Sequence, residues 1–384
     1  MQARIAWFER DQPLRNFKTG VSIHSHTNRS RESLEFVGNL LNSHPLLRTF
    51  LRSQREAANH TGLHLNLAKS YWTPPLCPRG AYELEKSQIE QHLDMRALVS
   101  LSDHDSIEAP MLLRVLPAML DAPVSLEWTV PFQTSKFHLG VHNLPGDRAQ
   151  VWMDDLHACT AQPTTARVCD LLRSLHSVPG VLIVFNHPLW NLYANPAAEF
   201  AQNLEDFLAL NNSCLHAFEL NGLRRLDENR RVAQFASKWQ QIVVSGGDRH
   251  GCEPNGILNL TNAPSFSEWV EEVRVDRRSQ LLFMPQYGDS MVARYYQTFL
   301  DAIRDYPDHS EGARYWDQRT YHPGRDGSMQ PLSSLWARVP GFLRTILDFA
   351  RLAETTQLLN KLRTRFGQPM TTMSDVFGQE EGVR

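Results

Sequence analysis

Histidines are the residues of this chain that could do chemistry: there are sixteen, and several stand beside carboxylates in short polar clusters. His24 and His26 are separated by a single residue. Side chains two residues apart on a strand point to the same side, so these two imidazoles could hold one cation. A second cluster spans residues 102–105 and contains His104. Asp105 in that cluster could instead cap a following helix.

A glutamate inside an apolar run adds a carboxylate to these imidazoles. Glu127 stands between Leu126 and Trp128. A buried carboxylate is costly unless it is paired or binds a metal, so this position favours a ligand. His138 and His142 follow shortly afterwards, four residues apart, and would share one face of a strand.

Two further clusters close apolar runs later in the chain. His187 lies in an Asn-His-Pro sequence directly after the most apolar run. The segment 246–251 places Asp248 and His250 two residues apart, and its glycines would let the backbone come close to a ligand. Imidazoles combined with carboxylates are ligands that zinc, manganese and iron accept. The clusters together therefore predict a metal centre.

The elements that must position these side chains are seven short apolar or β-branched runs, most of which end at or carry one of the clusters. The runs are 21–26, 97–102, 124–128, 137–141, 181–185, 217–220 and 242–245. Segments with helical spacing, such as 168–175, alternate with them. Alternating strands and helices predict an α/β fold with a parallel sheet or barrel, and seven strands favour a barrel. In such barrels the chemistry sits where the C-terminal strand ends converge.

Composition narrows the class of protein. The 384 residues are 42% hydrophobic and 21% charged, which is typical of a globular chain. A net charge of −3 gives no general affinity for a nucleic-acid backbone, so nucleic acid would be bound only as a substrate in a cleft. Five dispersed cysteines, no long apolar run and a polar N-terminus predict a cytoplasmic protein without disulfides or membrane contact.

Two segments depart from the strand–helix alternation. Residues 43–96 are long for a connection and are interpreted as an insertion that could cover a site. From residue 291 the periodicity becomes helical with loops rich in proline, glycine and charge. We therefore expect a catalytic domain at 18–290, with the insertion, and a helical C-terminal extension at 291–384. The oligomeric state is left open.

The order of the motifs resembles the PHP (polymerase and histidinol phosphatase) family of phosphoesterases. The motifs are H-x-H, D-H-D, a strand glutamate, H-x-G, N-H-P and G-x-D-x-H, and they run from about residue 20 to residue 251. The resemblance implies a distorted (β/α)7 TIM-like barrel of the PHP type. It also implies two or three divalent ions, zinc, manganese or iron, at the C-terminal strand ends.

The resemblance assigns the ligands of a first metal and its link to a second. His24 and His26 would bind the first metal together with Asp248. Glu127 would bridge the first and second metals.

The remaining histidines would complete the centre. His138 and His187 would bind the second metal, and His138 is preferred to His142 because its distance from the strand glutamate resembles the family spacing. His104 and His250 would hold a third metal or contact the phosphate.

One departure from the family pattern concerns that third site. Arg31 stands where the family usually has an aspartate, and Glu32 is the neighbour that could replace it. Alternatively, Arg29 and Arg31 could bind the phosphate in place of a cation, with Arg249 as a further basic group beside the centre. Both Arg29 and Arg31 could also simply open a solvated helix.

The implied activity is hydrolysis of phosphate esters by a metal-activated water. Asp248 could accept the proton, and His104 or His250 could protonate the leaving oxygen. The substrate would be a small phosphomonoester or a nucleotide, with exonuclease-type cleavage of nucleic-acid ends as the alternative.

Two other classes of protein compete with this interpretation. An amidohydrolase-type enzyme would use a bridging lysine at a strand end, a place that Glu127 takes here. A non-catalytic scaffold of the same fold would be expected to lose ligands, whereas eight expected positions are intact.

Overall fold

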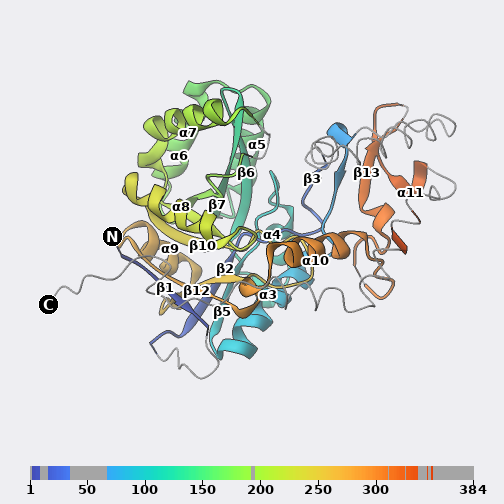
Figure 1. Ribbon diagram of the computed structural model, residues 1–384, viewed down its shortest axis with the longest axis horizontal. Helices are drawn as coiled ribbons and strands as arrows, with labels where there is room; N and C mark the ends of the chain where they lie inside the picture. Colours follow the sequence, from blue (N-terminus) through green and yellow to red (C-terminus); the bar gives the residue numbers. More distant parts are fainter. Residues whose placement is uncertain are drawn as a thin grey trace.

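The structure is a mixed α/β arrangement with helices packed around its sheets (Figure 1). The computed structural model of the chain describes residues 2–8, 16–34, 67–191, 195–309, 311–324, 326–335, 344 and 347–348. Within these ranges the strands pair into three sheets, and no helix is long and apolar enough to cross a bilayer.

All seven predicted runs form strands. They are β2 (Thr19–Ile23), β5 (Arg96–Ser100), β6 (Val124–Phe132), β7 (Ser135–Leu144), β8 (Leu182–Asn186), β9 (Ala217–Asn221) and β10 (Ile242–Gly246). Every residue of β2, β8, β9 and β10 is buried. Such continuous burial is expected for strands that are covered on both faces.

Two five-stranded sheets form the body of the molecule, in the orders β10-β9-β8-β7-β6 and β1-β12-β11-β2-β5. The three strands that sequence patterns did not reveal are β1 (Gln2–Trp7), β11 (Ile257–Thr261) and β12 (Arg278–Phe283). Isolated parallel bridges, Ser25 with Arg249 and His104 with Glu127, join residues just beyond β2 and β5 to the edges of the other sheet. The ladders between the described strands do not themselves close into a barrel.

The expectation of parallel strands is wrong for part of the body. β7 pairs antiparallel with both β6 and β8, and β11 pairs antiparallel with β2 and β12. Only Gln133 and Thr134 separate β6 from β7, and Gln133 has a φ of 52°. Because a parallel crossover needs about a dozen residues or more, a two-residue connection can only make a hairpin.

Helices cover the sheets through apolar stripes. They are α3 (Pro78–Leu93), α4 (Glu108–Leu113), α5 (Ala149–Ala161), α6 (Thr165–Ser177), α7 (Ala197–Asn211), α8 (Leu226–Lys238) and α9 (Phe266–Arg274), with short 3-10 turns at Pro117–Met119, Asn212–Cys214 and Pro285–Gly288. In α6 the buried residues Val168, Leu172 and Leu175 follow helical spacing. The five cysteines are free thiols, as predicted.

The predicted insertion divides into two parts. Residues 43–66 lie outside the described residues. The described remainder holds a 3-10 turn at Leu67–Lys69, strand β4 (Tyr71–Trp72) and α3. Helix α3 packs on β2 and β5 and buries Glu85 and Ile89, so it belongs to the body of the fold.

A small third sheet lies beside the body, on the right of Figure 1. Its order is β14 (Met329–Pro331), β13 (Thr320–Pro323), β4 and β3 (Glu32–Ser33). Helix α10 (Met291–Ile303), a turn at Trp316–Gln318 and α11 (Leu332–Leu335) accompany it. The expected helical extension from residue 291 therefore contains two strands in its described part, because backbone pairing with β4 holds β13 extended.

Candidate metal centre

All eight residues predicted to bind metal lie together, six of them just after body strands and two inside strands. His24 and His26 follow β2, and His104 follows β5. The other five residues come from the second sheet: Glu127 in β6, His138 in β7, His187 after β8, and Asp248 and His250 after β10. The nearby bridges between the two sheets bring these strand ends to one place.

Within the described part of the chain, four groups of side chains could each hold a cation. The ligand atoms of each group lie within 4.8 Å of one another. The groups are His24 with His26 and Asp248; His24 with Glu127 and His187; His104 with Glu127 and His138; and His26 with Glu32, His104 and His250. Neighbouring groups share a residue, so they form one linked centre.

Glu127 lies at the middle of the linked groups and is fully buried. Its Oε2 lies 3.1 Å from His24 Nε2 and 3.2 Å from His104 Nδ1. Its Oε1 lies 3.3 Å from His138 Nδ1 and 3.1 Å from His187 Nε2. The two carboxylate oxygens therefore face different imidazoles, which is the geometry that a bridging ligand requires.

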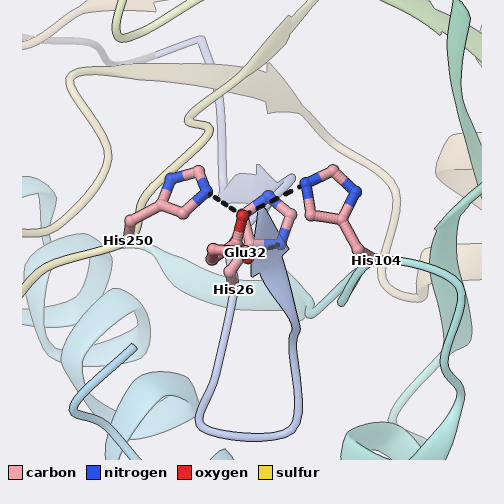
Figure 2. A group of neighbouring side chains, drawn as sticks. All are labelled: His26, Glu32, His104 and His250. Atoms are coloured by element: carbon pink, nitrogen blue, oxygen red, sulfur yellow. Dashed lines mark ion pairs between the residues drawn. The ribbon is translucent and has the colours of Figure 1, made fainter. Parts of the chain in front are cut away.

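Glu32 takes the place that the family pattern left in doubt. Figure 2 shows its carboxylate between His104 and His250, with Oε2 3.3 Å and 3.0 Å from their Nε2 atoms. Its Oε1 lies 3.6 Å from His26 Nδ1. The Arg31 guanidinium instead lies 5.5 Å from the centre of the Tyr71 ring. The possibility that Glu32 replaces the missing aspartate thus agrees with its position.

A second buried glutamate, Glu219 in β9, supports the ligands from behind. Its Oε1 lies 2.5 Å from His24 Nδ1, and its Oε2 accepts a hydrogen bond from the backbone N–H of His187. A carboxylate on the far nitrogen orients a ligating imidazole and raises its basicity. Sequence reasoning missed Glu219, although a charged residue inside an apolar run was the signal that singled out Glu127.

Gly246, the last residue of β10, and Gly247 after it leave room for buried side chains of the protein. A Cβ atom at Gly246 would collide with Glu219 Oε1, and one at Gly247 would collide with the Asn255 side chain. The expectation that these glycines admit a ligand is therefore corrected: they admit Glu219 and Asn255.

Three of the eight residues have left-handed backbone. The φ angles are 62° at His24, 28° at His187 and 53° at Asp248. Such conformations cost about 1–3 kcal/mol each for residues other than glycine. They turn the chain sharply at strand ends, so that His24 and His187 face Glu127 and Asp248 faces His24.

The aspartates beside His104 hold the surrounding loops. Asp103 accepts hydrogen bonds from the backbone N–H and the hydroxyl of Thr27, and burial raises its pKa to about 7. Asp105 accepts a hydrogen bond from the Thr129 N–H. The suggested helix cap at Asp105 is wrong, since the residue before α4 is Ile107.

Burial and mutual charge set the protonation of the centre. Burial lowers the pKa of His26 to about 3. Burial also opposes charge on His104, but Glu32 and Glu127 raise its pKa to about 10. Burial alone would raise the pKa of Glu127, yet the surrounding histidines hold it well below its usual value. Glu127 therefore stays ionised, and its buried negative charge must be balanced by the surrounding imidazoles or by bound cations.

The donor atoms fit divalent metal ions. His24 Nε2, His26 Nε2, His138 Nδ1 and Glu127 Oε2 are buried, and although they lie within ion-pair distance of neighbouring groups, none makes an aligned hydrogen bond. Leaving such atoms unsatisfied costs about 1–3 kcal/mol each, whereas a cation would satisfy several at once. His142 lies outside the four groups, with its Nδ1 3.0 Å from the Ser100 hydroxyl.

The three arginines expected near a phosphate occupy different settings. Arg249 is buried, and its three nitrogens donate to Glu85, Gly251 and His26, so it joins loops of the protein. Arg29 is partly exposed and pairs with Glu108 at 2.9 Å. Arg31 is exposed.

Comparisons with known proteins give only remote likenesses. No protein-family profile and no curated protein matches the chain. Among solved structures, an amidohydrolase from Chromobacterium violaceum is 13% identical, with a TM-score of 0.35 over 52% of this chain and 92% of that one. PsfC from Pseudomonas syringae is 14% identical, with a TM-score of 0.36 over 54% and 85%. A candidate metal-dependent phosphoesterase from Bifidobacterium adolescentis is 14% identical, with a TM-score of 0.31 over 52% and 91%.

Proposed function

We propose that this chain is a metal-dependent hydrolase of phosphate esters of the PHP type. The observation that carries the proposal is the linked set of buried imidazoles and carboxylates around Glu127, with unpartnered donor atoms facing one another. The bridges of Ser25 with Arg249 and of His104 with Glu127 support a distorted (β/α)7 barrel, since they connect both edges of the β6–β10 sheet to the segments that follow the paired strands β2 and β5. The catalytic domain would span residues 18–290.

Divalent cations held by these residues would activate a water molecule and neutralise charge on the phosphoryl oxygens. Asp248 is the candidate proton acceptor, and Asn221 Nδ2 orients it through a 3.2 Å hydrogen bond to Oδ2. His104 and His250 are the candidate proton donors because their side chains are 16% and 15% exposed, whereas His24 is fully buried. His250 Nδ1 lies 2.7 Å from the Asp248 carbonyl, a contact that fixes its ring.

The proposed substrate is a small phosphomonoester or a nucleotide. Three ionised carboxylates close to imidazoles suit a site that holds cations against a phosphoryl group. Cleavage of nucleic-acid ends is the alternative within the same chemistry. Turnover of a phosphomonoester panel against single-stranded oligonucleotides separates them, and preference for the oligonucleotides would favour the alternative.

The test begins with elemental analysis of the purified protein and a phosphatase screen with added Mn²⁺ or Zn²⁺. Glu127→Ala is expected to lose metal and turnover together. Its metal affinity should fall by more than about 100-fold, because losing a residue that only hydrogen-bonds to a metal ligand already costs about 10–100-fold. A protein that binds no metal and stays inactive after reconstitution contradicts the proposal.

A matched pair of variants on β7 sharpens this test. His138 and His142 are both buried on one strand, but only His138 faces Glu127 within a cation group. His138→Asn is expected to reduce metal content and turnover, whereas His142→Asn is expected to leave metal content unchanged. The opposite order would reassign the ligand.

A further inference from the structure

Arg224 lies on the loop after β9 and is connected to the candidate metal centre through two neighbouring residues. Its guanidinium carbon lies 3.3 Å from the centre of the Trp190 ring, and that ring lies 5.0 Å from the His187 ring. Its backbone N–H donates to the carbonyl of Asn221, whose side chain donates to Asp248. The loop that carries Arg224 is thus tied to two candidate metal ligands.

The guanidinium is held in place by a hydrogen bond to a neutral hydroxyl and by one long ion pair. Arg224 is only 7% exposed, and its NH1 group donates to the Tyr295 hydroxyl at 3.1 Å. That hydroxyl donates in turn to the carbonyl of Leu223. The Glu228 carboxylate forms the long ion pair, its Oε1 lying 3.8 Å from Nε, and Nε has no hydrogen-bond partner. A buried donor without a hydrogen bond is costly, so an oxygen acceptor that completes it would be favourable.

The Trp190 ring, on which Arg224 stacks, also lines a hollow beside the candidate metal ligands. This small hollow is open to solvent, and His138 and His187 line it together with Trp190. Stacking on a tryptophan face fixes the plane of a guanidinium, and a fixed plane favours two parallel hydrogen bonds to phosphate oxygens.

We propose that Arg224, seated on Trp190 and held by Tyr295, binds the phosphoryl oxygens of the substrate beside the metal centre. This inference rests on the proposed phosphoesterase function. Tyr295 belongs to α10, so the segment after residue 290 contributes a positioning residue to the site.

The test is calorimetric titration of the metal-loaded protein with inorganic phosphate, alongside steady-state kinetics on a phosphomonoester. Arg224→Gln is expected to weaken phosphate binding and raise KM by about 10–100-fold, the worth of hydrogen bonds from a charged donor, with metal content unchanged. Arg225→Gln is the matched control, because the Arg225 side chain is 64% exposed and pairs with Asp227. It is expected to match the wild type in both measurements.

Two further variants keep the test decisive if Arg224→Gln does not fold. Tyr295→Phe removes the hydroxyl that holds Arg224 and is expected to raise the phosphate Kd by about 3–10-fold. Arg224→Lys keeps the charge but loses the planar fork, so it should fall between wild type and Arg224→Gln. Wild-type phosphate affinity in all folded variants overturns the inference.

Failure of the inference differs from failure of the proposed function. A wild type that hydrolyses phosphomonoesters while Arg224→Gln keeps its KM contradicts the role of Arg224 alone. A wild type that binds phosphate through Arg224 but hydrolyses no ester supports the anion site and contradicts the phosphoesterase.

Discussion

Two regions of this molecule bring histidines together, and they differ in what surrounds the rings. In the candidate metal centre, buried carboxylates stand between the imidazoles, and His24 Nε2 and His26 Nε2 have no hydrogen-bond partner. In the second region, His176 Nδ1 lies 2.9 Å from His216 Nε2, and His216 Nδ1 accepts a hydrogen bond from the Ile183 N–H. Both nitrogens of His216 are therefore used within the protein.

The charges around His104 and His216 shift the pKa values of these two histidines in opposite directions. Burial lowers the pKa of His216 to about 3, helped by Arg274 and Arg277. Burial also acts on His104, but the carboxylates of Glu32 and Glu127 raise its pKa to about 10. Proximity of imidazoles is thus no sign of a metal site. Ionised carboxylates and unpartnered nitrogens together are what distinguish the centre.

Metal removal is expected to show the largest difference between the two regions, because only the candidate metal centre should respond to it. Chelation should lower the free energy of unfolding by about 4 kcal/mol relative to protein held at about 1,000 times the metal Kd, because the cations bind only the folded centre. Urea denaturation with and without chelator measures this difference. His216→Asn should keep the full metal dependence, and Glu127→Ala should lose it. Identical unfolding curves for loaded and chelated wild type would contradict the metal centre.

The supporting carboxylate gives a smaller effect within the centre. Glu219→Gln is expected to weaken metal affinity by about 10–100-fold, since outer partners orient their imidazole ligands. Competition with a chromophoric chelator measures the affinity. Glu205→Gln, which alters an exposed carboxylate paired with Lys238, is the charge-matched control and should leave affinity unchanged. If both variants bind metal equally well, Glu219 has no supporting role.

The stability of the protein at acid pH tests the second region. It is expected to give the smallest change in unfolding free energy, counted per pH unit. The pKa of His216 is about 3 in the folded chain, while an unfolded histidine titrates near 6.5. The unfolded chain then binds the proton more readily, so the contribution is complete above about pH 6.5 and is lost as the pH falls toward 3. The loss is about 1.4 kcal/mol per pH unit.

The matched variant for this pH dependence is His216→Asn, whose side-chain oxygen can still accept from the Ile183 N–H. Urea denaturation at pH 5 and pH 7 should show a shallower loss of stability in the variant than in the wild type. Parallel losses in both proteins would show that His216 does not contribute.

Sequence reasoning located the strands well where they are short, apolar and buried. It missed β11, which is a comparable buried run, β12, whose first three residues are polar, and the edge strand β1. The predicted parallel pairing was wrong at β6 and β7. The hairpin depends on a two-residue turn in which Gln133 adopts a left-handed φ, and glutamine does not predict that conformation.

The chemistry of the centre was determined by the sequence itself: which residues carry imidazole or carboxylate, and that each stands at or inside an apolar strand. These are local properties, since burial patterns and spacing along a strand involve neighbouring residues. Tertiary structure alone decided that Glu32 lies between His104 and His250, and that Glu219 supports His24 from 195 residues away. It also placed Arg224 against Trp190. Contacts between distant residues arise from packing of the whole chain, and no local pattern contains them.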